Sequence, residues 1–370
     1  MYFSTAGALA LSSIFGTSFA FARVNNVPVD TSTLDELYHK ALKEDRKLVL
    51  ASGGDAGVQG ESMKAAWAAR FPKIALDLTV DLSKYHDSRI DRAYWANNET
   101  VDIAMLQTLN DFQRWKEEGR LLFYKPPTFA DLYSGETDLD GAFLPVNVDS
   151  FGTFSWDSTY VSASDAPTSY ADLLDPKWKG KIVATYPNDD DAIGYLFSII
   201  IEKYGFEWLD ALAAQDVQWV RGTATPGFVM RDNHYNATTS ASGSSPKGRV
   251  LSFTTHPPSN ETFFQMAQPA APEQHMAWTQ TAAAFASTKR PATAKLFLAW
   301  VTSDEWQKAS TSGSPRKSLD IGGTVYTSNT TQTSQFRQFM QDRRRVEWWK
   351  LQYETTLGTA QGVSPLALYP

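Results

Sequence analysis

The amino-acid sequence predicts an α/β fold of two lobes, with doubly wound sheets and hinge crossings between the lobes. Short apolar runs alternate with segments of helical spacing over the first 120 residues, which is typical of a parallel sheet with crossover helices. The sequence then changes to extended segments at residues 143–156, where we expect the chain to cross into a second lobe. The 370 residues, 42% of them hydrophobic, are enough for two separate cores.

In the first lobe, strands are predicted where short apolar runs are bounded by turn residues. Helices are predicted where apolar residues recur at a spacing of three or four. Helices are expected at residues 33–43, 83–95 and 110–118, and a further helix is expected to end at residue 69. Strands are expected at residues 47–51, 74–80 and 102–106.

The same criteria predict the second lobe and the return of the chain to the first. The expected strands are 181–184, 217–220 and 250–253, with an apolar helix at 192–202, a flexible polar loop at 238–246, an apolar stretch at 275–285, and helices at 292–302, 304–310 and 333–353. We therefore assign residues 30–150 and 270–370 to the first lobe and residues 151–269 to the second.

The first 22 residues have the features of a signal peptide. Residues 9–21 are apolar, and Ala20 and Ala22 flank Phe21 in the pattern of a signal-peptidase site. No segment reaches the ~20 apolar residues of a membrane-spanning helix, so we expect a soluble, secreted protein without membrane insertion. Asn-x-Ser/Thr sequons, which fit glycosylated loops and eukaryotic secretion, occur at Asn98, Asn236, Asn260 and Asn329.

Charge and residue usage exclude several classes of function. The net charge of −7 argues against nucleic acid or an anionic membrane as the main partner. The chain has no cysteine, so a thiol nucleophile or a thiolate metal site is impossible. The histidine spacing gives no HxxxH or HExxH pattern. We expect a monomer with a small-molecule ligand, and we predict no catalytic residue, no cofactor and no metal ligand.

Three stretches carry a family resemblance. Residues 167–181 read PTSYADLLDPKWKGK, residues 101–105 read VDIAM with GRL at 119–121, and residues 292–307 read ATAKLFLAWVTSDEWQ. In these stretches the chain resembles the family 1 extracellular solute-binding proteins of ABC import systems, in the branch that includes iron, thiamine and polyamine binders. The resemblance covers residues 47–316 and implies the type 2 periplasmic-binding-protein fold. With the sequons, it suggests a eukaryotic, fungal-like secreted member.

The first of these stretches has a physical explanation of its own. Asp175 precedes a proline, which pushes it out of the helical region, Trp178 offers a large body to bury, and Gly180 can turn. This motif stabilises the fold and does not indicate which ligand is bound. The resemblance implies capture of a small ligand in a cleft by hinge closure, without catalysis, and a membrane permease as partner in bacterial relatives.

In such folds ligands lie at the carboxyl ends of strands and the N-termini of helices. The candidate ligand-binding residues at these places are Ser52, Gly53, Gly54, Asp55, Gln107, Thr108, Trp156, Asp189, Asp190, Arg221, Thr223 and Trp278.

Each candidate also has a purely structural interpretation. The N–H groups of residues 52–55 could hold an anion or form a plain tight turn. Arg221 with Thr223 suits a carboxylate or phosphate, or Arg221 pairs with an acid of its own lobe. Asp189 and Asp190 could bind a cation or cap the helix that follows. The two tryptophans could stack on a ligand or belong to the core.

Two other functions fit the composition. A secreted glycosidase would need two carboxylates ~5–10 Å apart, and the sequence spacing selects no such pair. A glycan-binding adhesin would present a flat aromatic platform and have no hinge.

Overall fold

The computed structural model describes residues 27–239, 248–310, 312–320 and 333–369. The predicted signal peptide, the sequon at Asn329 and most of the polar tract at 238–246 lie outside the described residues. The other three sequon asparagines, Asn98, Asn236 and Asn260, are exposed at the surface. Among the described residues, no helix combines the length and apolar character needed to cross a membrane.

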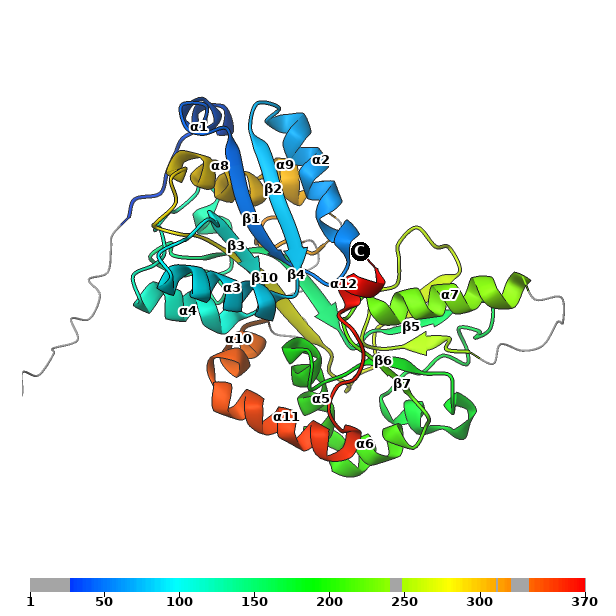
Figure 1. Cartoon of the computed structure of the whole chain (residues 1–370). Coiled ribbons are helices and arrows are strands. Elements are labelled where there is room, and N and C mark those ends of the chain that lie inside the picture. Colours follow the sequence, from blue (N-terminus) through cyan, green and yellow to red (C-terminus); the bar gives the residue numbers. More distant parts are fainter. Residues whose placement is uncertain (1–26, 240–247, 311, 321–332, 370) are drawn as a thin grey trace, which may run out of the picture.

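The first lobe is built on a five-stranded sheet with the order β2-β1-β3-β10-β4 (Figure 1). The strands are β1 (Lys47–Gly53), β2 (Ala75–Asp81), β3 (Ile103–Leu106), β4 (Leu144–Phe151) and β10 (Met276–Ala284). β1 pairs in parallel with β2 and β3, as predicted from the alternating pattern. β10 runs antiparallel to both β3 and β4, so the whole sheet is mixed, and its parallel part is the part formed by the first 120 residues.

Helices cover both faces of this sheet, because side chains alternate between the faces of each strand. These helices are α1 (Leu34–Ala41), α2 (Glu61–Arg70), α3 (Ser83–Trp95), α4 (Leu109–Glu117), α8 (Pro291–Val301) and α9 (Asp304–Gln307). Leu48 and Leu50 of β1 pack with Trp67 of α2 and Trp300 of α8 in one core cluster. Ala51 points the other way, into a second cluster with α4. This is the doubly wound arrangement that the sequence predicts.

The second lobe contains two smaller sheets around one apolar helix. β5 (Phe154–Asp157) pairs antiparallel with β8 (Leu251–Ser252) and β9 (Phe264–Ala267), and β6 (Val183–Thr185) pairs in parallel with β7 (Gln218–Val220). The helices are α5 (Asp191–Tyr204), α6 (Phe206–Ala213) and α7 (Thr225–Thr239). α5 is apolar on nearly all sides because it forms the centre of this lobe's core.

The scaffold motif at 167–181 holds the second lobe together as its residue types predict. Trp178 is 3% exposed, and Gly180 has a φ of 74°, which disfavours any residue with a side chain. The indole of Trp208 on α6 donates to the carbonyl of Tyr170 at 2.9 Å, so the motif is fixed against the neighbouring helix.

The predicted helix 333–353 is two helices, α10 (Thr333–Gln341) and α11 (Arg343–Leu357). The break falls at Asp342, because its carboxylate accepts a hydrogen bond from the N–H of Arg345 and so starts a new helix. Apolar side chains of both helices belong to the same cluster as α5. The domain boundaries stay a prediction. This packing favours the second lobe for α11, whereas Arg337 of α10 donates to Glu136 and Thr281 of the first lobe.

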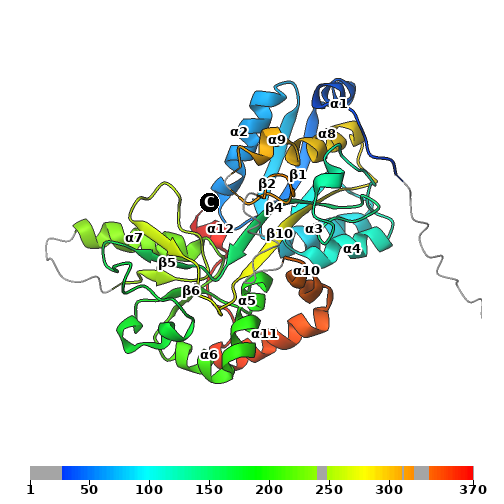
Figure 2. The same cartoon turned by 180° about the vertical axis from the view of Figure 1, so that it is seen from behind.

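Two strands and the C-terminal segment connect the lobes. β4 and β10 run from the first sheet toward the second lobe, where β5 and the segment before β10 begin (Figures 1 and 2). After α11 the chain turns back, and α12 (Pro365–Leu368) lies at the junction of the lobes, beside the start of α7.

Candidate functional site

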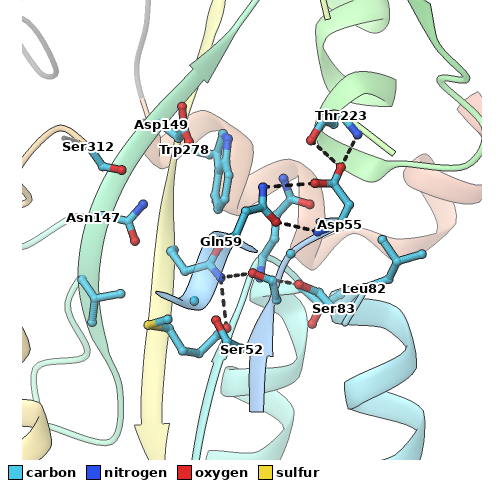
Figure 3. A pocket seen from close by; sticks show the side chains of 18 of the residues that line it. Ser52, Asp55, Gln59, Leu82, Ser83, Asn147, Asp149, Thr223, Trp278 and Ser312 are labelled. Carbon is cyan, nitrogen blue, oxygen red and sulfur yellow. Dashed lines mark hydrogen bonds between the residues drawn. The ribbon is translucent and has the colours of Figure 1, made fainter. Parts of the chain in front are cut away.

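A pocket with a volume of about 730 Å³ lies between the lobes. Its first wall is formed by the carboxyl ends of β1 and β3 and the start of α3. Its second wall is formed by the turns that lead into α5 and α7, and β4 and β10 form its back (Figure 3). This is the place where ligands bind in open α/β sheets.

The structure brings most of the predicted site residues together at this pocket. Those that line it are Ser52, Gly53, Gly54, Asp55, Gln107, Thr108, Asp189, Asp190, Thr223 and Trp278. Trp156 and Arg221 do not line it. Trp156 is 3% exposed within the core of the second lobe, which is the structural alternative for this residue.

Asp55 links the two lobes directly. Its Oδ2 accepts hydrogen bonds from the backbone N–H of Thr223, from the Thr223 hydroxyl at 2.9 Å and from the N–H of Ala224 at 3.0 Å (Figure 3). These donors stand just before α7, whose N-terminus attracts negative charge. A carboxylate of the first lobe therefore occupies the anion position of a helix in the second.

The N–H groups of the turn after β1 are not free, contrary to the anion-cradle hypothesis. The N–H of Gly54 donates to Asp81, and those of Asp55 and Ala56 donate to Oε1 of Gln59 at 2.7 and 3.1 Å. Gln59 is a site residue that the sequence analysis missed, because an exposed glutamine one turn into a helix has no distinctive signal. The turn is thus closed by the side chain of Gln59, and Asp55 is the residue of this turn whose carboxylate reaches the second lobe.

Asp189 carries a second set of contacts between the lobes. Lys84 of the first lobe donates to its Oδ1 at 2.8 Å, and Arg221 of its own lobe donates to its Oδ2 at 3.0 Å. Arg221 also reaches the hydroxyl of Tyr85 in the first lobe at 3.2 Å. Burial opposes ionisation of Asp189, but these cations outweigh it and lower its pKa. Arg221 thus lies outside the pocket lining and holds the carboxylate of Asp189, which belongs to the lining.

The two following aspartates differ in their surroundings. Asp190 caps α5 by accepting from the N–H groups of Ala192 and Ile193 at 2.9 and 3.0 Å. Burial without a cation in contact raises the pKa of Asp190 to about 6. Asp191 is also buried, but ion pairs with Arg343 and Lys350 lower its pKa.

Further acidic side chains, not predicted from the sequence, complete the lining. Asp87 on α3 and Asp111 on α4 lie close together, and both accept from Arg114. Burial first, and then the charge of Asp111, raise the pKa of Asp87 to about 7. Asp149 on β4 is the register partner of Trp278 on β10, so a carboxylate and an indole share this part of the back wall (Figure 3).

The lining is acidic overall. Among the described residues, the charged side chains of the pocket are seven aspartates (Asp55, Asp87, Asp111, Asp149, Asp189, Asp190 and Asp191) against Lys84, Arg343 and Lys350. In the same described part of the chain, no group of three or more His, Asp or Glu side chains is arranged so that it could hold a metal ion.

Solved structures that share this fold include substrate-binding and periplasmic binding proteins. The substrate-binding protein of an ABC transporter from Agrobacterium tumefaciens is 14% identical with a TM-score of 0.68, covering 86% of this chain and 97% of its own. AfuA from Actinobacillus pleuropneumoniae, solved with fructose-6-phosphate, is 14% identical with a TM-score of 0.62 and covers 84% and 99%. Iron-bound HitA from Pseudomonas aeruginosa is 17% identical with a TM-score of 0.59 and covers 84% and 99%.

Sequence comparison points the same way. No curated protein matches this chain. The profile of the family described as "Bacterial extracellular solute-binding protein" matches residues 98–315, which is more than half of the chain and includes the scaffold motif at 167–181. The pocket between the lobes, the fold of the relatives and this match agree, and the chain belongs to the family of bacterial extracellular solute-binding proteins.

Proposed function

We propose that this protein captures a small ligand with a positively charged group between its lobes, and that it does no chemistry on that ligand. The observation that carries this proposal is the excess of aspartates over lysine and arginine in the pocket lining. Relatives with this fold include an iron-bound protein, a protein with fructose-6-phosphate and a thiamin-binding protein. The fold therefore accepts unlike ligands, and the charge of this lining is what selects among them.

The cations of the pocket are already paired with aspartates, which leaves acidic groups for a ligand. Lys84 contacts Asp189, while Arg343 and Lys350 both contact Asp191. Among the remaining carboxylates, Asp87 pairs with Arg114 and Asp149 pairs with His256, both outside the lining, and Asp190 has no ion-pair partner among the described residues. A ligand ammonium at the back wall would meet the carboxylate of Asp149 and the indole of Trp278 together, which is the combination that binds organic cations.

The cellular setting follows from the sequence features. The predicted signal peptide and sequons support secretion from a eukaryotic cell as a monomeric glycoprotein. In that setting capture or sequestration of the ligand is the primary role. The absence of a catalytic role rests on the family, whose members bind solutes.

The test is a ligand panel on the secreted, natively purified protein. Native mass spectrometry and thermal unfolding would be measured with putrescine, arginine, choline and thiamine, and with citrate, phosphate and glucose 6-phosphate. We expect a stabilisation by cations alone, which grows with ligand concentration as binding to the folded state requires. Binding of anions alone, or turnover of a glycan, would overturn the proposal.

A variant pair separates pocket charge from total charge. Asp149→Asn removes one carboxylate from the back wall, and we expect it to weaken binding of the stabilising cation at least about tenfold. Asp77→Asn is the matched control, because Asp77 is half-exposed on the edge strand β2, where it pairs with Lys47. Equal loss in both variants would show that only the overall charge matters.

A further inference from the structure

The segment after α11, residues 358–369, returns from the base of the second lobe to the edge of the pocket (Figure 1). Its first part lies on the second lobe. Asn188 donates to the carbonyl of Gly358 at 3.1 Å, and Arg221 donates to that of Gly362 at 3.4 Å. Both partners flank the pocket, since Asn188 precedes Asp189 and Arg221 is bonded to it.

The middle of the segment packs against the turn before α7. A Cβ atom placed on Gly222 would lie 2.7 Å from the Pro365 side chain and 3.1 Å from Oδ2 of Asp55. Gly222 also has a φ of 81°, which strains any other residue. The turn is therefore held between Pro365 on one side and the carboxylate from the first lobe on the other.

The end of the segment contacts both lobes through one residue. The ring of Tyr369 packs on Phe228 of α7 in the second lobe, with the ring centroids 4.3 Å apart. The carbonyl of the same residue accepts a hydrogen bond from the N–H of Gly57 in the first lobe at 3.3 Å. Gly57 follows the turn that carries Asp55, so the bridge lies next to the Asp55–Thr223 contact.

We propose that residues 358–369 form a strap that holds the two lobes closed over the pocket. No strap residue is part of the pocket lining, so the strap acts on lobe closure and not through ligand contact. Its role in ligand exchange rests on the proposed function, because slower opening keeps a captured solute in place longer. Its effect on the closed state requires no ligand at all.

The experiment measures the distance between the lobes in the ligand-free protein. The chain contains no cysteine, so Ala65→Cys on α2 and Ala211→Cys on α6, both exposed, give specific sites for a fluorophore pair. Single-molecule energy transfer would compare the full chain with a chain that ends at Gly358. We expect the population with separated lobes to rise about fivefold on truncation, from loss of the Tyr369 ring contact and hydrogen bond.

Point variants keep the test decisive if truncation harms folding. Tyr369→Ala removes the ring that packs on Phe228, and we expect a smaller rise in the same direction. Leu368→Ala is the control, because Leu368 directly precedes Tyr369 and is 53% exposed. Thermal unfolding of each variant checks that both lobes stay folded.

The outcomes distinguish this proposal from the ligand proposal. Unchanged energy transfer in both the truncated chain and Tyr369→Ala would overturn the strap, whatever the protein binds. Lobe separation on truncation with no cation binding in the panel would keep the strap and overturn the ligand class. Equal opening in Leu368→Ala and Tyr369→Ala would also overturn the strap proposal, because the effect would then not depend on the bridging residue Tyr369.

Discussion

One carboxylate oxygen of Asp55 accepts hydrogen bonds from both the backbone N–H and the hydroxyl of Thr223, across the boundary between the lobes. Asp55 is buried, so this contact has little competition from water. The closed arrangement thus has a polar contact of its own, formed by the protein without a ligand. A solute entering the pocket would add its own contacts with both lobes to this one.

Replacing this carboxylate should open the protein. Asp55→Ala leaves the donors before α7 without their partner, and a hydrogen bond to a charged group contributes about 1.5–3 kcal/mol. We expect at least a tenfold rise in the open population, a change of ~1.4 kcal/mol, in the energy-transfer assay with the labelled pair. Asp77→Ala, which removes a carboxylate far from the junction, should leave the signal unchanged.

The contact between Lys84 and Asp189 gives closure a dependence on salt. Lys84 is 39% exposed, so dissolved ions screen this pair in part. We expect the open population of the wild type to increase when salt is raised from about 0.05 to about 1 M. Lys84→Met lacks the pair and should be more open at low salt, with a weaker response. A response of equal size in both proteins would show that other charges control closure.

Two tryptophans proposed from the sequence as equivalent candidates should now behave differently. Both are buried in one core cluster, but Trp278 also lines the pocket whereas Trp156 does not. Trp278→Leu should therefore weaken cation binding and also lower the free energy of unfolding. Trp156→Leu should lower the free energy of unfolding by roughly 2–4 kcal/mol and leave affinity unchanged. Urea unfolding and calorimetric titration of both variants measure the two effects separately.

The order of the elements could be predicted because each depends on local sequence. Strand β1 is marked by a short apolar run and helix α3 by its helical spacing, and the motif around Trp178 marks the entry to the second lobe. The direction of β10 could not be predicted, because pairing partners far apart in sequence decide it. The same holds for the break at Asp342, where a short side chain competes with a continuous helical pattern.

The pocket could be predicted by its position but not by its chemistry. Residues at strand ends, such as Asp55 and Thr223, were found because topology places such positions together. Asp87 was missed, because it lies within a helix and only the tertiary fold brings it to Asp111. The pairing of Arg221 with Asp189 was left open, since the sequence contains no information on which way either side chain points.

The neighbouring buried aspartates should respond to pH in opposite directions. Burial raises the pKa of Asp190 to about 6, above the value of ~3.9 expected in the unfolded chain. Between these values the unfolded chain has released the proton and the folded protein has kept it, so stability falls as pH rises. Asn at this position keeps an acceptor for the N-cap and does not titrate. The stability of Asp190→Asn relative to the wild type should therefore increase from pH ~4 to pH ~7.

Asp191 is the internal control for this effect. Burial raises its pKa, but Lys350 and Arg343 lower it further, and the net shift is downward. Its contribution to stability is present above the unfolded pKa and is lost as pH falls through the folded one. Asp191→Asn should therefore be most destabilised near pH 7 and approach the wild type in acid. Urea unfolding of all three proteins from pH ~2 to pH ~7 measures both trends, the one at Asp190 between pH ~4 and pH ~6 and the one at Asp191 below pH ~4. Curves that stay parallel over the whole range would contradict the assigned ionisation of this pair.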